Sequence, residues 1–324
     1  MTPRFPLGKL AVTALVLGLA ACEEPTSSTT SMNPTDTPSL ASAEAEQQLA
    51  SIMDDANVAL AARGEHYQVA KAEYVTRVSD GEFGGTVLAK DVGNKQLADD
   101  FVPNDVNRED WSGPAGGAAD NITYAVDQTG DAVPPLGGLT AAQTDAAIVA
   151  AMSSWDAVNC SDLPITRNDD FGLDIGLVAF LNGLGGSQFV FADVQHAGWE
   201  IDFAGGILGV TFTFIFIDDD GNEVDADNDG RTDVAFREIY YDPSFGWAVD
   251  GVDDADIDVE SVALHEAGHG LSQAHFGKVW LKNDGTLKAS PRAVMNALYA
   301  APFRSLAGTD NGGHCSNWAQ WPNN

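Results

Sequence analysis

Basic residues are scarce in this 324-residue chain, which has 16 Lys and Arg residues against 48 Asp and Glu residues and a formal net charge of −32. Negative charge on this scale repels the phosphates of nucleic acids and anionic lipid headgroups. Long hydrophobic runs are also missing, because no stretch approaches the roughly 20 apolar residues that span a bilayer. We therefore expect no nucleic-acid partner and no permanent transmembrane helix.

Cysteine is rare, and the first of only three cysteines follows an apolar run at the N-terminus. Arg4 and Lys9 precede this run, residues 10–21, which has the length of a secretory signal. The run ends in L-A-A-C, which resembles a bacterial lipobox and implies cleavage before Cys22 and attachment of a lipid to it. The alternative is an ordinary secretory signal with an incidental cysteine. We expect an exported protein, lipid-anchored to a bacterial membrane and facing the periplasm or the cell surface.

Composition divides the mature chain into a tether and two folded regions. Residues 22–42 are rich in Ser, Thr and Pro and have no aromatic residue, which predicts a flexible tether. Residues 43–115 contain a helical pattern and a strand-like run, and they form either a pro-region, an accessory domain or an N-terminal extension. The larger region, 116–324, contains Cys160 and Cys315, and we expect an exported protein to join them in a disulfide.

Histidine is also rare, yet three of the six histidines lie within the eleven residues H-E-A-G-H-G-L-S-Q-A-H, 265–275. On a helix, His265 and His269 are one turn apart and project from the same face. Two neutral imidazoles in that position can bind zinc, and Glu266 can take a proton from a water beside the metal. His275 lies too far along the chain for the same face, so the chain must turn back to bring it to the metal.

The residues that follow the second histidine limit the choice of the third zinc ligand. One class of zinc hydrolase uses a glutamate from a downstream helix, but no glutamate follows Glu266. Asp284 and Asp310 are the available aspartates in an alternative ligand set. His275 is nearer to the first two ligands, so we expect a three-histidine site.

The segment resembles the zinc-binding signature of the metzincin proteases, H-E-x-x-H-x-x-G-x-x-H followed by a methionine turn. The resemblance implies that Met295 forms this turn, and that Tyr299, four residues later as in the matrixin subgroup, lines the substrate pocket. Two positions depart from the family: Ser272 replaces the glycine before the third histidine, and Phe276 follows it. The family glycine leaves the helix in a left-handed conformation, which costs other residues about 1 kcal/mol or more.

The resemblance also implies an α+β fold, in which a twisted mixed sheet lies against the active-site helix. We expect this helix at 258–271 and an earlier helix at 140–159. Apolar, β-branched and aromatic residues predict strands within 205–216. The resemblance implies a further strand at 122–127 and a strand and loop at 237–247.

An acidic cluster, D-x-D-x-D-G-x-x-D, provides the alternating oxygen ligands of a calcium loop. Its carboxylates are those of Asp225, Asp227, Asp229 and Asp233. Phe236 stands where a complete EF-hand loop has glutamate, so the alternative is an acidic, solvated loop. A second zinc site at Asp193 and His196 is a further alternative, although we expect His196 to be a surface residue.

The sequence therefore predicts a zinc-dependent endopeptidase that hydrolyses polypeptides extended along its cleft, pairing with an edge strand. Calcium is the expected structural cofactor. The alternative is a zinc- or calcium-binding surface lipoprotein without catalytic activity.

Overall fold

The computed structural model describes residues 43–77, 89–90, 97–103, 105, 107–108, 121–168, 170–252, 255–281 and 287–322. The predicted signal peptide, tether and Cys22 lie outside the described residues. Contacts place Pro34–Asn324 in one compact unit. Within the described residues, no helix is both long enough and apolar enough to cross a membrane.

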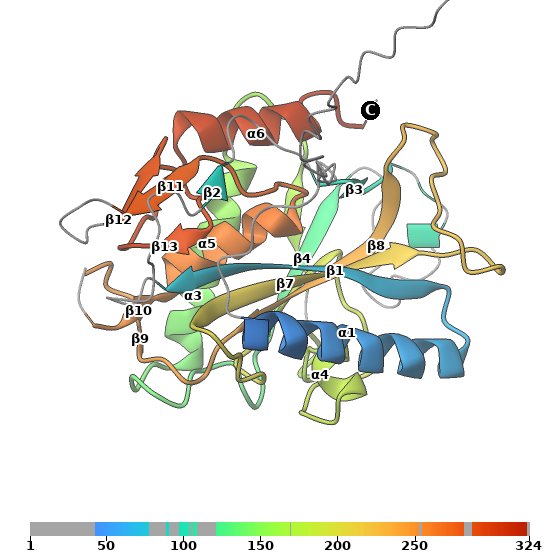
Figure 1. Ribbon diagram of the computed structural model, residues 1–324, viewed down its shortest axis with the longest axis horizontal. Helices are drawn as coiled ribbons and strands as arrows, with labels where there is room; N and C mark the ends of the chain where they lie inside the picture. The colour runs from blue at the N-terminus through green and yellow to red at the C-terminus, as the bar shows by residue number, and fades with distance from the viewer. Residues whose placement is uncertain are drawn as a thin grey trace, which may run out of the picture. The chain divides into compact units, whose positions relative to one another are not determined.

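The core of this unit is an eight-stranded mixed sheet, with the order β13-β1-β7-β8-β6-β4-β5 and β3 paired to β8 (Figure 1). Strands β5, β4, β6 and β8 are parallel to one another, and β7 is antiparallel to both β8 and β1. The strands of this sheet are β1 (Tyr67–Arg77), β3 (Asp99–Asp100), β4 (Ile122–Val126), β5 (Ile165–Arg167), β6 (Val194–Gly198), β7 (Ile207–Phe216), β8 (Thr232–Tyr241) and β13 (Leu298–Tyr299).

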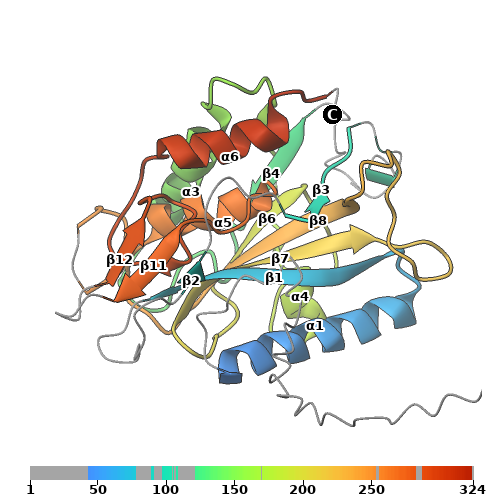
Figure 2. The same ribbon diagram turned by 45° about the horizontal axis from the view of Figure 1, so that its top comes forward.

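Helices cover both faces of the sheet, as the turned view in Figure 2 shows. One face packs against α3 and α5 in an apolar cluster that includes Trp155 and Leu264, and the other packs against α1 and α4 around Leu49 and Val178. The helices are α1 (Ala43–Arg63), α3 (Ala141–Asp156), α4 (Leu177–Leu181), α5 (Val259–Gly270) and α6 (Gly308–Trp318). These findings confirm the predicted α+β class with a mixed sheet.

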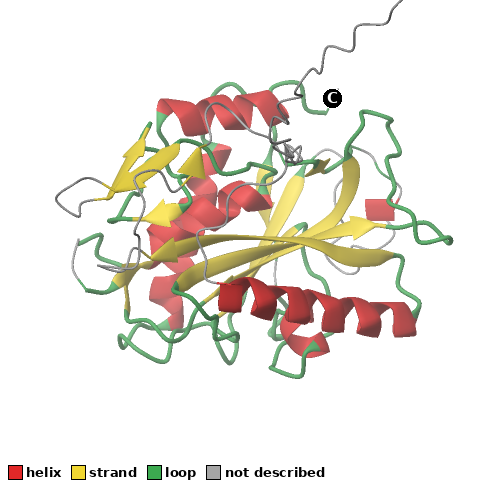
Figure 3. Ribbon diagram, viewed as in Figure 1, coloured by secondary structure: helices red, strands yellow, loops and turns green. Residues whose placement is uncertain are grey.

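Short strands complete the described structure (Figure 3). A parallel pair of strands forms just before α5. A separate sheet has three strands, two of which follow α5 in the sequence, while the third comes from the N-terminal region. The pair is β9 (Trp247–Ala248) with β10 (Ile257–Asp258), and the three strands are β2 (Ala89–Lys90), β11 (Lys278–Leu281) and β12 (Leu287–Ser290).

The two long helices of the C-terminal region begin at polar residues that cap their first turns. Asp258 accepts a hydrogen bond from the Ser261 backbone N–H at 2.9 Å, which satisfies one of the free donors at the start of α5. At the start of α3, the Gln143 side chain accepts from the Thr140 N–H at 3.0 Å. Both helices lie within the ranges expected from the sequence.

The N-terminal region contributes two strands, β1 and β3, to the main sheet. Strand β1 lies between β7 and β13, so β7 is an internal strand of the sheet. Sequence patterns could not show this pairing, because it joins residues about 130 positions apart, such as Tyr74 and Val210. The described part of 43–115 therefore shares one sheet with the C-terminal region.

A disulfide joins Cys160, just after α3, to Cys315 in α6, with a Cα–Cα distance of 5.7 Å. The two residues are 155 positions apart. The bond ties α6 to the end of α3, on the same face of the sheet as α5.

Candidate metal centre

The three clustered histidines meet at one point. The Nε2 atom of His265 is 3.0 Å from that of His275 and 3.1 Å from that of His269, and His269 and His275 are 3.1 Å apart. Nitrogens that bind one tetrahedral ion at 2.0–2.1 Å lie about 3.3 Å from each other. The three imidazoles therefore form a triangle of the size that a single metal ion requires.

Backbone carbonyls fix the tautomers of the first two imidazoles. The Nδ1 of His265 is 2.7 Å from the carbonyl of Val294, and the Nδ1 of His269 is 2.7 Å from the carbonyl of Gln273. A carbonyl can only accept, so each Nδ1 donates and each Nε2 has a free lone pair. Burial lowers the pKa of His265 to about 4, and it lowers the pKa values of His269 and His275 well below 6.5 with help from neighbouring imidazoles. All three rings are thus neutral, as metal ligands must be.

The turn that brings His275 back is built on Ser272, which has a φ of +63°. This residue therefore adopts the left-handed conformation for which the metzincin signature uses glycine. Its Oγ accepts a hydrogen bond from Arg237 at 2.9 Å, and its carbonyl accepts from Asn317 at 3.0 Å and from Leu97 at 3.0 Å. Partners on three other segments hold the strained serine in place.

Met295 lies directly under α5. The Sδ atom of Met295 occupies the space that a side chain on Gly268 would need, so Met295 packs closely against the helix between His265 and His269. The N–H groups of Val294 and Met295 donate to the two carboxylate oxygens of Asp310 at 3.0 and 3.1 Å. Asp310 is therefore a support for this turn and not a metal ligand, and the other alternative ligand, Asp284, lies outside the described residues.

The carboxylate of Glu266 lies between two strands. Its Oε2 accepts from the Thr211 hydroxyl on β7 at 2.7 Å, and its Oε1 accepts from the Val75 N–H on β1 at 3.2 Å. Burial raises the pKa of Glu266 to about 8, against the lowering effect of these two hydrogen bonds. A pKa raised towards neutrality makes the carboxylate a stronger proton acceptor, which suits a general base.

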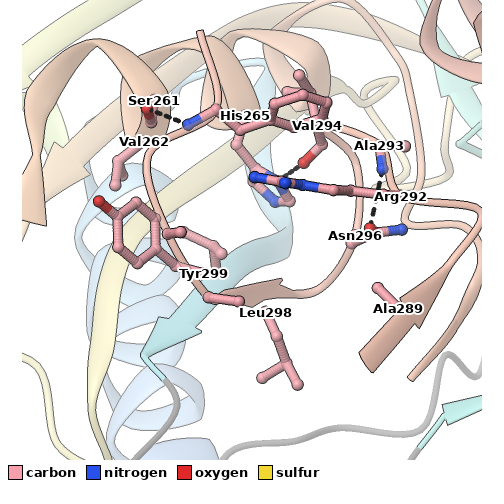
Figure 4. A pocket seen from close by; sticks show the side chains of 14 residues that line it. Ser261, Val262, His265, Ala289, Arg292, Ala293, Val294, Asn296, Leu298 and Tyr299 are labelled. Atoms are coloured by element: carbon pink, nitrogen blue, oxygen red, sulfur yellow. Dashed lines mark hydrogen bonds between the residues drawn. The ribbon is translucent and has the colours of Figure 1, made fainter. Parts of the chain in front are cut away.

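A cavity of about 330 Å³ opens beside His265 (Figure 4). Val262, Leu298 and Tyr299 line it, and Val75 of β1 also contributes to the wall. The Tyr299 hydroxyl accepts a hydrogen bond from the N–H of Asp258 at 3.1 Å, which fixes the ring at the cavity wall.

His196 is fully buried, so the surface position expected for it was wrong. Its Nδ1 is 2.7 Å from the hydroxyl of Tyr241, and burial lowers its pKa to about 3. Asp193 forms a buried ion pair with Arg108 at 3.0 Å and accepts from Thr123. Within the described residues, the two side chains do not join a group able to hold a metal ion.

The acidic loop brings together three of its four predicted ligands. Carboxylate oxygens of Asp225, Asp227 and Asp229 lie within 4.8 Å of one another on the surface. Asp233 is not part of this group, because it is buried and accepts a hydrogen bond from the Ala226 N–H at 2.9 Å. Asp233 therefore closes the loop, and the carboxylate group that could hold a cation consists of the other three aspartates.

A second carboxylate group was missed by the sequence analysis. Oxygens of Asp127, Asp131 and Asp174 lie within 4.8 Å of one another, and Asp127 and Asp131 each have a buried oxygen without a hydrogen-bond partner. Burial, together with the neighbouring carboxylates, raises the pKa of Asp131 to about 8 and that of Asp127 to about 6. Asp174 is 43 residues from Asp131, so no local pattern could have revealed the group.

Comparison with known proteins adds no family to this site. No protein-family model matches the chain, and no curated protein matches it.

Proposed function

We propose that this protein is a zinc-dependent endopeptidase with a metzincin-like fold. The observation that supports it most is the convergence of three neutral, buried imidazoles, the first of which directly precedes Glu266 in the chain; the Glu266 carboxylate forms no ion pair within the described residues. The donor set of three histidine nitrogens suits zinc, whose catalytic sites use three protein ligands. When bound, zinc would lower the pKa of a water molecule and polarise the carbonyl of the peptide bond.

The protein's own residues supply proton transfer and positioning. Glu266 accepts a proton from the attacking water and delivers it to the amine of the leaving residue. Thr211 holds the Oε2 atom of this carboxylate through its 2.7 Å hydrogen bond, while Oε1 accepts from the Val75 N–H. The side chain that follows the cleaved bond enters the cavity between Val262, Leu298 and Tyr299, which selects for apolar groups.

The Glu266→Ala variant tests this function. We expect it to bind one zinc ion per chain and to keep its circular-dichroism spectrum, while hydrolysis of an unfolded protein falls at least about a hundredfold, in line with the loss of a general base. Loss of zinc is expected instead from His269→Ala, which is the matched variant one turn further along α5. Undiminished hydrolysis by Glu266→Ala would contradict the proposal.

Export and lipid anchoring at Cys22 are part of the same proposal, which places the substrates outside the cytoplasm. They are tested by the mass of the mature N-terminus in a bacterial host, where a Cys22→Ala variant should lack the lipid. The alternative is a lipoprotein that binds zinc or calcium without catalysis. It predicts stoichiometric metal and no hydrolysis by the wild-type protein under any condition.

A further inference from the structure

Strand β1 occupies the part of the sheet where a peptide substrate would lie. An extended peptide binds to a sheet by adding a strand to an open edge. Without β1, the strand β7 would present such an edge beside Glu266, since Thr211 of β7 contacts the carboxylate. In the structure, β1 pairs with β7 over the whole length from Tyr67 to Thr76 (Figure 1).

The end of β1 is held on both sides, as a substrate in a cleft would be. Thr76 and Arg77 run parallel to β13, the strand that bears Tyr299 of the cavity wall. The Thr76 N–H donates to the carbonyl of Ala297 at 3.5 Å, and the Arg77 N–H donates to the carbonyl of Gly206 at 2.8 Å. These bonds fix the position of the residues before them.

Val75 is the residue of β1 that meets the chemistry of the site. Its N–H donates to the Oε1 of Glu266 at 3.2 Å, and its buried side chain lines the cavity beside His265. In the proposed function, Glu266 gives a proton to the amine of the leaving residue. Among the described residues, the backbone nitrogen that hydrogen-bonds to this carboxylate is that of Val75. The bond placed for hydrolysis is therefore Tyr74–Val75.

The rest of the N-terminal region holds β1 in this position. The Asn57 side chain of α1 bonds to both the carbonyl and the N–H of Val69, at 2.9 and 2.7 Å. Gln48 of α1 bonds to the carbonyl of Asp202 and the N–H of Ala204, at 2.8 and 2.7 Å. Such a tethered strand acts at an effective concentration on the order of millimolar, so an external peptide must compete with it.

We propose that β1 is an internal, substrate-like strand that closes the cleft to other peptides and presents the Tyr74–Val75 bond to Glu266. This inference rests on the proposed endopeptidase function. In the cleavage, the oxygen of water bonds to the carbonyl carbon of Tyr74 and the bond to the Val75 nitrogen breaks. Both protons of the water reach that nitrogen, the first through Glu266 and the second from the new carboxylic acid, which leaves a carboxylate at Tyr74 and an ammonium group at Val75.

A binding experiment tests the closure without any turnover. In the full chain with Glu266→Ala, the affinity for a fluorescent, unstructured peptide is measured with Val75→Ala and with Val69→Ala. Both valines are 2% exposed and on the same strand, but only Val75 lines the cavity. We expect about tenfold tighter binding with Val75→Ala, because the internal strand loses apolar contacts in the cleft, and unchanged binding with Val69→Ala. Equal affinities for the two variants would overturn the closure, and circular dichroism verifies that both are folded.

The cleavage is tested in the zinc-loaded wild-type protein by mass spectrometry over time. We expect a new N-terminus at Val75. Its half-time of formation should be independent of protein concentration, and it should not form in Glu266→Ala. A first cut at another bond would overturn the assignment, as would an intact chain in a preparation that hydrolyses added peptide. If Val75→Ala opens the cleft while no peptide or chain is ever hydrolysed, the endopeptidase function fails and the closure by β1 stands.

Discussion

At the scale of single residues, the candidate metal centre depends on side chains outside the three-histidine segment. Arg237 is fully buried. Its guanidinium donates hydrogen bonds to the Gly270 carbonyl and the Ser272 hydroxyl at the end of α5, and to Thr213 on the neighbouring strand β7. Asp99 neutralises its charge at 2.7 Å, and desolvation nevertheless lowers the pKa of the guanidinium. A glycine at position 272 would relax the backbone, but it could not accept the hydrogen bond from Arg237. The departure from the family motif is therefore compensated by a partner from β8.

The variants Ser272→Gly and Ser272→Ala separate these two effects. Glycine removes a backbone cost of about 1 kcal/mol, but it leaves a buried charged donor unsatisfied, which costs about 1.5–3 kcal/mol. We expect Ser272→Gly to lower the free energy of unfolding by about 1 kcal/mol. Ser272→Ala loses the same hydrogen bond and keeps the strain, so it should be about 1 kcal/mol less stable again. Urea denaturation gives both values, and a Ser272→Gly protein more stable than wild type would show that strain outweighs the bond.

At the scale of secondary-structure elements, local patterns were sufficient where an element is defined by its own residues. The helix expected at 258–271 is α5 at 259–270, because Asp258 caps it and its apolar residues are all buried. Patterns were insufficient where partners come from distant segments. The pairing of β1 with β7 and the meeting of Asp127 with Asp174 are properties of the folded chain, as is the support of Ser272 by Arg237.

The cluster of three carboxylates formed by Asp127, Asp131 and Asp174 makes the free energy of unfolding depend on pH. The pKa values of Asp131, about 8, and Asp127, about 6, exceed the ordinary value near 4. The folded protein therefore binds more protons than the unfolded chain between about pH 4 and pH 8, so this group lowers stability as pH rises through that range. With a chelator present, we expect the melting temperature to fall from pH 5 to pH 8, and to fall less in Asp131→Asn.

Asp219 provides the control for this measurement, because its carboxylate is 95% exposed and solvent screens its interactions. The Asp219→Asn variant removes the same charge and should retain the wild-type change in melting temperature. A profile for Asp131→Asn that matches both wild type and this control would show that the buried group does not produce the pH dependence.

At the scale of the whole molecule, α6 and its disulfide support the metal centre from the C-terminal side. The Nε1 of Trp318 donates to the carbonyl of Leu271 at 2.9 Å, and Asn317 binds the next carbonyl. Asp310 of the same helix binds the methionine turn. The turn to the third histidine and the turn beneath the metal thus share one helix, and Cys315 attaches that helix to the end of α3.

Removal of the disulfide should therefore weaken the whole unit. A link between residues 155 positions apart restricts the unfolded chain by about 5 kcal/mol in the loop-entropy description. We expect the double variant Cys160→Ala, Cys315→Ala to lose several kcal/mol of unfolding free energy in urea. Ser161→Ala is the matched control, because its hydroxyl joins the same two segments through a 3.0 Å hydrogen bond to Trp318 and its loss should cost about 1 kcal/mol. A double variant that loses no more than this control would mean that contacts of α6, and not the covalent link, hold the C-terminal helix against the metal centre.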